Sequence, residues 1–368
     1  MNDVFILGAG FSKAVSSKMP ITKELSREVL EWYKLQNGID LNIRNMIEED
    51  FEKALTFLAS DKPWLSETEN LRHRALYLDL TTVIRYWFLQ KSRDPSVWGN
   101  NRPPNWLEAL IAYWHNNQSS VITLNYDTLL ERVASATYSP KRPTIPTTNL
   151  YPIRLTPAAL QNDPVQTRCI ETEKRMETFK LFKLHGSINW FYSGRPEFFG
   201  EQLYFVPCNG GLDGVFDMVD GSDPDRVDWH RLGGKPPLIV PPTLNKSAFF
   251  QHESLRSMWF QAGEAIKRAS KIVCFGYSLP DSDLTIVQFL KSCRPQEQIA
   301  FEIVDLETGN KFESKVEHFD RLIGKDLYKF QQKYSGTASI PEFVIKNLIK
   351  DPQDKAQAAM GINWPRPK

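Results

Sequence analysis

Cysteine is scarce in this chain, and its four cysteines, Cys169, Cys208, Cys274 and Cys293, are scattered and never form a C-x-x-C pair. Zinc ribbons need closely spaced cysteine or histidine pairs, and disulfide frameworks need an oxidising compartment. We therefore expect no bound zinc or other metal, no structural disulfide, and a cytoplasmic setting.

An excess of charge is missing as well, because 45 Lys plus Arg face 44 Asp plus Glu, for a net charge of +1. A dedicated nucleic-acid binder needs surplus positive charge to displace counterions, so we expect contact with nucleic acid only through a partner. No apolar run approaches the roughly 18 residues of a membrane span. The opening MNDVFILGAGFSK lacks the basic region of a signal peptide, so neither a leader nor a membrane segment is expected.

What the chain does contain is enough apolar material for a large core: 368 residues, 41% hydrophobic and 12% aromatic. Its strand-length apolar runs are mostly continuous rather than alternating, as expected for strands buried on both faces of a parallel sheet. The pattern predicts an α/β fold with a Rossmann-like, doubly wound parallel sheet. The runs are Val4–Leu7, Val121–Leu124, Leu181–Leu184, Leu238–Val240, Ile272–Phe275 and Phe301–Val304.

Helical patterns follow one another without an intervening strand in residues 36–117, which predicts an all-helical insert. We expect residues 1–310 to form one nucleotide-binding domain that contains this insert and two loop-rich inserts, at about 138–178 and 193–237. Residues 311–368 are predicted to be a helical C-terminal region that serves assembly or partner contact.

Within that C-terminal region, helices are expected at 311–333 and 341–350, and the proline-rich tail from residue 351 is expected to be irregular.

The first motif, Gly8-Ala9-Gly10-Phe11-Ser12, directly follows the first predicted strand. Glycines at such a turn let backbone N–H groups approach a diphosphate. Lys13 stands where the dinucleotide fingerprint G-x-G-x-x-G has its third small residue, so a tight turn without a ligand remains open.

Two further motifs follow predicted strands: Asn125 and Asp127 after Val121–Leu124, and His185 with Gly186 after Leu181–Leu184. Ligands of open α/β sheets bind at the carboxyl ends of strands. The plain alternatives are that Asn125 and Asp127 cap the next helix and that His185 is structural.

The last two motifs are Gly276-Tyr277-Ser278, after Ile272–Phe275, and Asp305, after Phe301–Val304. Each is ordinary loop chemistry by itself. The informative feature is the ordered set of five motifs, each at the carboxyl end of a predicted parallel strand.

This ordered set resembles the sirtuin family, in which GAG-x-S, Asn-x-Asp, His-Gly, G-x-S and a late strand end mark the NAD-binding and catalytic positions. The resemblance covers roughly residues 1–35, 118–137, 179–192 and 236–306. It implies that Asn125, His185 and Asp127 are catalytic. It also implies that NAD is the substrate and is held by Gly8, Ala9, Gly10, Phe11, Ser12, Gly276, Tyr277, Ser278 and Asp305.

The departures point to one branch of that family. Sirtuin deacylases carry a four-cysteine zinc ribbon and a Phe-Arg segment after the first motif, and this chain has neither. The stretch Asp50–Leu55 (DFEKAL) is similar to one in the zinc-less, sirtuin-like NAD hydrolases of bacterial antiviral defence. The resemblance implies cleavage of NAD to nicotinamide and ADP-ribose.

Such an activity would kill its host if it were uncontrolled, so we expect gating by a homo-oligomer or by a partner such as a HerA-type hexameric ATPase. Two alternatives stay open: a protein deacylase of the sirtuin type, and a catalytically silent NAD-binding assembly subunit.

Overall fold

The computed structural model describes residues 3–34, 41–93, 102–136, 144–153, 155–157, 176–192, 203–206, 235–240, 252–281, 283–324 and 328–360. Within them the chain forms a six-stranded sheet of spatial order β10-β9-β8-β1-β2-β4, in which neighbouring strands are parallel. Its strands are β1 (Asp3–Leu7), β2 (Ser120–Thr123), β4 (Lys180–Lys183), β8 (Lys271–Phe275), β9 (Ile299–Asp305) and β10 (Tyr328–Ser335). The expected Rossmann-like α/β fold is confirmed.

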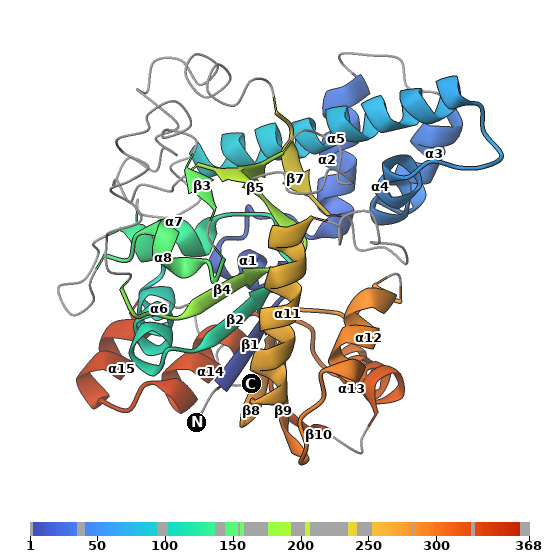
Figure 1. The fold of residues 1–368 in the computed structure, drawn as a ribbon. Helices are drawn as coiled ribbons and strands as arrows, with labels where there is room; N and C mark the ends of the chain where they lie inside the picture. The colour runs from blue at the N-terminus through green and yellow to red at the C-terminus, as the bar shows by residue number, and fades with distance from the viewer. Residues whose placement is uncertain are drawn as a thin grey trace.

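Helices cover both faces of this sheet (Figure 1). On one face lie α1 (Ala9–Val15), α6 (Asn105–Asn117), α7 (Leu129–Ser135), α14 (Ser339–Phe343), a π-helix (Val344–Leu348) and α15 (Pro352–Ala359). The other face carries α11 (Glu253–Lys267), α12 (Leu284–Ser292) and α13 (Asn310–Ile323). Coverage on both sides explains why the central strands are continuous apolar runs.

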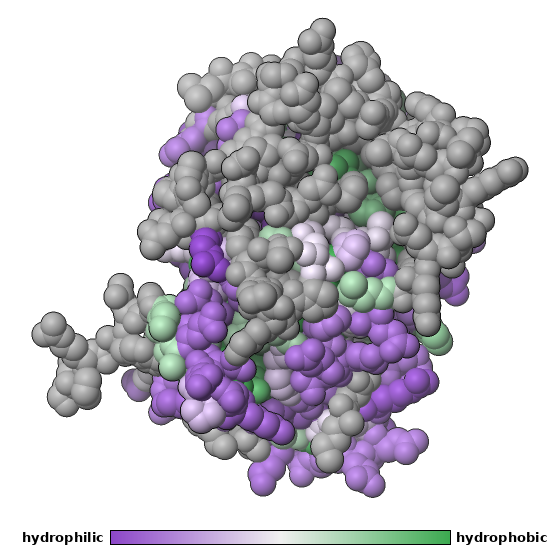
Figure 2. All heavy atoms as spheres, turned by 90° about the vertical axis from the view of Figure 1, so that its left-hand side faces the viewer, coloured by the Kyte–Doolittle hydropathy of each residue, from purple (hydrophilic) through white to green (hydrophobic). Residues whose placement is uncertain are grey.

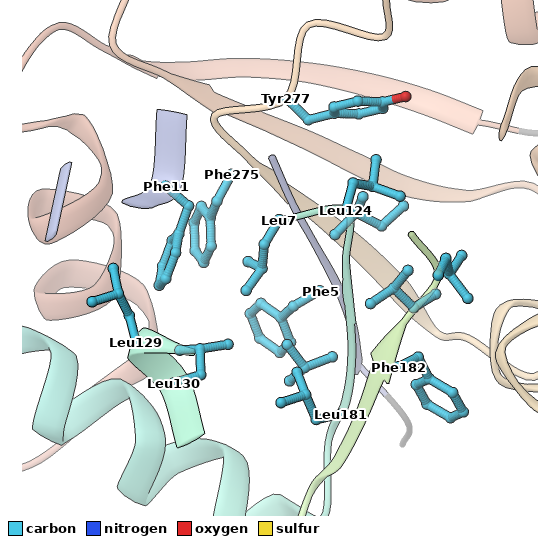
Figure 3. Packing of buried hydrophobic residues seen from close by; sticks show 14 of the residues in the cluster. Phe5, Leu7, Phe11, Leu124, Leu129, Leu130, Leu181, Phe182, Phe275 and Tyr277 are labelled. Carbon is cyan, nitrogen blue, oxygen red and sulfur yellow. The ribbon is translucent and has the colours of Figure 1, made fainter. Parts of the chain in front are cut away.

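The core beside α1 is aromatic. Phe11 of α1 stacks on Phe275 of β8 at 6.0 Å between ring centroids (Figure 3). The Phe11 ring also meets Trp106 of α6 edge to face. Phe5 of β1 contacts Phe275 and Trp114 of the same face. Each of these side chains is almost fully buried, and burial of an aromatic ring stabilises the fold by roughly 1.5–3 kcal/mol.

A second layer lies above the carboxyl edge of the main sheet (Figure 1). It holds four of the helices and a four-stranded sheet of order β3-β6-β5-β7. The helices are α2 (Thr22–Lys34), α3 (Leu41–Glu49), α4 (Phe51–Ala59) and α5 (Glu67–Arg93). The strands are β3 (Thr156–Pro157), β5 (Gly186–Phe191), β6 (Tyr204–Phe205) and β7 (Pro237–Ile239). The Tyr77 hydroxyl of α5 donates to the Ile239 carbonyl of β7 and so ties the two together.

The described residues of the predicted insert 36–117 are helical apart from short connections and an isolated bridge residue, as expected. The loop-rich segments 138–178 and 193–237 lie mostly outside the described residues; their described parts include the short helix α8 (Thr147–Leu150) and the strands β3 and β6. The boundaries of the domains themselves stay a prediction.

Three sequence-based expectations are wrong. The run Leu238–Val240 contributes to β7 of the second sheet, antiparallel to β5, and not to the main sheet. The helix expected at 311–333 ends at Ile323 and is followed by β10, which pairs with β9. The tail expected to be irregular contains α15, whose first turn is capped by the Asp351 carboxylate. The C-terminal region therefore completes the main sheet and its cover.

None of the described helices combines the length and the apolar character that a membrane span requires.

Candidate functional site

The five predicted motifs lie on five adjacent strands of the main sheet, all at its carboxyl edge. In spatial order, β9 ends at Asp305, β8 precedes Gly276, β1 precedes Gly8, β2 precedes Asn125 and β4 precedes His185. Residues that are up to about 300 positions apart in the chain therefore meet at one edge, which is where ligands of open α/β sheets bind.

All five motifs line a single cleft of about 1190 Å³. Its floor is the strand ends, and its opposite wall comes from α2, the junction of α3 with α4, and Phe88 of α5. Pockets for drug-sized ligands measure about 300–1,000 Å³, so this cleft has room for a ligand as large as a dinucleotide.

The two glycine loops are pressed against each other. Gly8 N–H donates to the Phe275 carbonyl at 3.0 Å, and Gly10 N–H donates to the Gly276 carbonyl at 2.8 Å. A Cβ on Gly276, where φ is +58°, would lie 2.4 Å from the Gly10 carbonyl carbon. These glycines are therefore required for loop packing, and the N–H groups of Gly8 and Gly10 do not serve as the diphosphate donors that the motif suggested.

The other residues of the first motif divide by side. Ala9 and Ser12 line the cleft together with Gly8 and Gly10. Phe11 does not line it, because its ring is 1% exposed and packs in the aromatic core. The structure thus places Phe11, predicted to contact NAD, in the core and outside the cleft, because the first turn of α1 directs this side chain toward α6.

Asn125 is held by a chain of hydrogen bonds. Its Nδ2 donates to the Gly8 carbonyl at 2.8 Å and to Ser12 Oγ at 2.9 Å, and Ser12 Oγ donates in turn to Asp127 Oδ2 at 2.6 Å. Both amide hydrogens are thus engaged within the protein. Toward a ligand, the Asn125 side chain acts only as an acceptor, through Oδ1.

Asp127 is the last acceptor in this series of hydrogen bonds and holds it in place. Besides the Ser12 hydroxyl, its carboxylate accepts the Leu129 N–H at 3.1 Å, close to the start of α7. Its carbonyl accepts from Lys183 Nζ, which also lies 2.9 Å from Glu131 Oε1, and both of these charged side chains are 1% exposed. Asp127 therefore orients Asn125 through Ser12 and caps α7 at the same time.

His185 lies between the main sheet and the second sheet. Gly186, which follows it, has φ of +77°, and a Cβ there would lie 2.1 Å from the Leu238 carbonyl oxygen. Only glycine lets the chain turn from β4 directly into β5 beside β7. The His-Gly pair thus has a structural reason, and the turn directs the imidazole of His185 into the cleft.

The imidazole has an acidic neighbour that the sequence did not single out. Asp283 Oδ2 lies 3.5 Å from His185 Nε2 and accepts the Tyr277 hydroxyl at 3.0 Å. Asp283 is 1% exposed. Burial and the neighbouring Asp283 carboxylate hold the pKa of Tyr277 well above its ordinary value, so this phenol stays protonated and donates.

Tyr126, between Asn125 and Asp127, was also missed. Its ring lies 6.5 Å from that of His185, and it lines the cleft. Burial, and then the carboxylates of Glu52 and Asp283, raise the pKa of Tyr126 well above its ordinary value. Its position between two predicted site residues was the available signal.

At the far end of the cleft, Asp305 pairs with Lys315 at 2.8 Å and accepts the Glu307 N–H at 3.0 Å. Ser278, which is exposed, and Tyr277 lie between this pair and the glycine loops along the carboxyl edge. Asp305 could still accept from a ribose hydroxyl, but its carboxylate is already neutralised by Lys315.

No group of three or more metal-ligating side chains occurs among the described residues. The expectation that the protein carries no zinc stays a prediction.

Comparison with known proteins gives a distant structural likeness. No protein-family model and no curated protein match the sequence. The chain is similar to a crystal structure of Sir2 in complex with an inhibitor, 2′-O-acetyl-ADP-ribose and a deacetylated p53 peptide, with 15% identity and a TM-score of 0.35. The match covers 93% of this chain and 90% of that one. A likeness this distant assigns no role to any residue of this chain.

Proposed function

We propose that this protein is an NAD hydrolase that breaks the bond between nicotinamide and ribose and transfers the ribosyl group to water. The observation that carries the proposal is the convergence of Asn125, His185 and the two glycine loops on one dinucleotide-sized cleft. The acceptor oxygen of Asn125 and the imidazole of His185 come from the neighbouring strands β2 and β4.

The chemistry needs few groups. When the bond breaks, its electron pair goes to the nicotinamide nitrogen, which was cationic, and an oxocarbenium-like ribose remains. Water then forms the new bond to the ribose, and its proton is taken by a base. The products are nicotinamide, ADP-ribose and one proton.

His185 suits the role of base, because an imidazole titrates near cytoplasmic pH and can take a proton from water or from a ribose hydroxyl. Asn125 Oδ1 suits the role of acceptor for the carboxamide N–H of nicotinamide or for the attacking water. The Gly276–Ser278 loop and Asp305 lie farther along the same edge, where they suit the adenosine half.

The wall opposite the sheet is acidic. Glu48, Glu49, Asp50 and Glu52 line it at the junction of α3 with α4. Glu52 lies close enough to raise the pKa values of Tyr126 and Tyr277 beside His185. Fixed negative charge beside the ribose suits the role of stabilising the cationic, oxocarbenium-like transition state.

Incubation of the purified chain with NAD, followed by mass spectrometry, tests the proposal. We expect nicotinamide and ADP-ribose, or a cyclised form of it, in the presence of the activating partner. NAD that stays intact with and without the partner, although it binds, would favour the silent assembly subunit. Consumption of NAD only with acetyl-lysine peptides would establish the deacylase instead.

We further propose that the activity serves antiphage defence by NAD depletion and is gated by assembly or by a partner such as a HerA-type ATPase. The support is the need to control a toxic activity and the resemblance of the motifs to that class of hydrolase. Co-purification with the products of neighbouring genes, followed by the NAD assay, tests it.

Exposed aromatic residues would be candidates for an interface between subunits. Most of the aromatic residues of the insert and the C-terminal region are instead buried in the core. Among those that are described, Tyr77, Trp87, Phe88, Trp106, Trp114, Phe312, Phe319, Tyr328 and Phe343 are buried. Trp64 and Tyr86 are 72% and 45% exposed and are the better interface candidates. Figure 2 shows one face on which the described residues are mostly hydrophilic, with only small, separate apolar areas.

Light scattering of the wild-type protein, Trp64→Glu and Tyr86→Glu tests whether an assembly formed through these residues controls the activity. Loss of a multimer together with loss of activity would support gating by these surfaces. A monodisperse wild-type monomer with full activity would contradict gating by assembly.

A further inference from the structure

Asp283 stands where a helix cap is expected but does not act as one. It is the N-cap residue of α12, yet its side chain makes no capping hydrogen bond to the helix backbone. An aspartate at this position ordinarily accepts from the N–H of the second or third helical residue. Here the carboxylate is directed instead toward Tyr277 and His185.

The loop that carries Asp283 is held in an unusual backbone conformation. Gly276 has φ of +58°, and Leu279 has φ of +50°, which is rare for a residue with a branched side chain. Leu279 is fully buried, and its carbonyl lies 2.8 Å from Nε2 of His318 on α13. Such strain persists where the surroundings fix the loop, and it is concentrated at functional sites.

The surroundings of the carboxylate are closed. Asp283 and His185 are 1% and 3% exposed, and both line the cleft together with Tyr277 and Tyr126. A buried carboxylate is costly unless its charge is compensated. The Tyr277 hydroxyl supplies one donor, and an imidazole with hydrogen on Nε2 supplies a second.

We propose that Asp283 is the positioning residue of the proposed NAD hydrolase: it fixes the ring of His185 and selects the tautomer with hydrogen on Nε2. This proposal rests on the proposed function. In that tautomer the basic lone pair is on Nδ1. Nδ1 takes the proton from water or the ribose hydroxyl, and the Asp283 carboxylate stabilises the imidazolium that forms.

The charged and titratable groups that face His185 come from four elements. They are Asp283 at the start of α12, Tyr277 in the loop after β8, Tyr126 in the loop after β2, and Glu52 on α4, whose charge reaches both tyrosines. Of these groups, Asp283 places a carboxylate oxygen 3.5 Å from His185 Nε2.

Asp283→Asn keeps the shape and removes the charge. We expect kcat to fall roughly tenfold to a hundredfold at neutral pH, part of the contribution of a general base. An opposite charge raises the pKa of an imidazole, so its removal should move the acidic limb of the kcat profile to lower pH by about one unit. Asp283→Glu, which keeps the charge, should retain the wild-type limb.

Two variants complete the test. Tyr277→Phe removes the hydroxyl that shares the Asp283 charge, so the acidic limb should move the opposite way, to higher pH. Asp281→Asn is the matched control, because Asp281 lies in the same loop, 79% exposed, and pairs only loosely with His318 at 3.8 Å. It should leave kcat and its pH profile unchanged.

Histidine NMR makes the result independent of activity. In protein labelled with ¹⁵N-histidine, and with His185→Gln for assignment, the His185 titration should shift downward in Asp283→Asn and upward in Tyr277→Phe. If wild-type protein cleaves no NAD, the proposed function fails while these shifts still decide the pairing. Unchanged titrations in both variants would overturn the role of Asp283; if Asp283→Asn does not fold, Tyr277→Phe decides alone.

Discussion

Asn125 and His185 follow neighbouring strands of one sheet, but the protein holds them in different ways. Asn125 belongs to a connected network in which Ser12, Asp127, Lys183 and Glu131 are all nearly buried. Near His185, the Asp283 carboxylate comes from a loop about 100 residues further along the chain. The asparagine side of the cleft, meaning Asn125 and its network, is therefore part of the buried core. The histidine side, meaning His185 and Asp283, depends on a loop that packs against that core.

The difference has a physical reason. An acceptor that must stay fixed and neutral gains from a network that satisfies both of its donors. A base must change charge during turnover, and a nearby carboxylate stabilises the charged form without a rigid network. Stability and activity should therefore respond differently to changes on the two sides.

The largest effect, a loss of stability, is expected from the buried Lys183–Glu131 ion pair that supports the Asn125 network. Lys183→Met removes one partner of a buried ion pair. The Glu131 carboxylate would keep the hydrogen bond from the Tyr151 hydroxyl, at 2.9 Å, but would lose the opposite charge beside it. Breaking a buried pair costs about 3–5 kcal/mol in the free energy of unfolding. Urea denaturation measures the loss.

Two controls accompany it. Lys346→Met removes a surface lysine, 58% exposed and paired with Glu342 on the same helical stretch, and should change stability by less than about 1 kcal/mol. Lys183→Met combined with Glu131→Leu should recover much of the loss, because it leaves no uncompensated charge. A single variant as stable as wild type would show that the network does not support the asparagine side.

The next effect is on catalysis. Asn125→Ala and His185→Ala should each lower NAD cleavage by at least about two orders of magnitude, the scale of a general base or a positioned polar group. Thermal unfolding should separate them: Asn125→Ala leaves the Ser12 hydroxyl and the Gly8 carbonyl without their donor and should lose more stability. Full activity of His185→Ala in the activated state would refute the proposed chemistry.

Much of the main sheet was predictable, because strands buried on both faces must be apolar throughout. β1, β2, β4, β8 and β9 all lie within or beside predicted runs, and their order placed the five motifs at one edge. β10 was not predictable in this way. It lies at the edge of the sheet, and its sequence YKFQQKYS lacks the continuous apolar run that marks the central strands.

The position of the cleft was predictable, but some of its residues and several of their roles were not. In the fold, the run Leu238–Val240 was assigned to the wrong sheet, because burial alone cannot tell which of two sheets a strand joins. Asp283 lies at the start of a helix, where the sequence alone would suggest that an aspartate is a cap. Only the folded loop brings it to His185. Phe11 follows a glycine turn like a ligand contact, but the direction of α1 decides that it is core.

A smaller effect should come from the link between Asn125 and its anchor. Ser12→Ala removes the hydroxyl that accepts from Asn125 and donates to Asp127. The Asn125 amide then keeps its hydrogen bond to the Gly8 carbonyl but loses the one to Ser12. We therefore expect roughly tenfold slower cleavage, which is about 1.4 kcal/mol in activation free energy.

Ser12→Thr, which keeps the hydroxyl, is the matched variant if the added methyl is accommodated. Since Asn125 is proposed to bind the substrate and its amide does not titrate, Ser12→Ala should leave the pH profile of cleavage unchanged. A shifted acidic limb in Ser12→Ala would show that the two sides of the cleft are not separate.

The smallest effect is expected from metal removal, because neither side of the cleft needs a metal in the proposed chemistry. The sequence has no cysteine pair and no histidine cluster, so the donors of a structural zinc site are not provided. Elemental analysis should find no stoichiometric zinc, and EDTA should leave NAD cleavage by the chain itself unchanged, whereas an ATPase partner would still need Mg²⁺. One zinc per chain, or activity that EDTA abolishes and zinc restores, would mean that a metal site on residues outside the described ranges supports one side of the cleft, and the comparison of Asn125 with His185 would then have to include it.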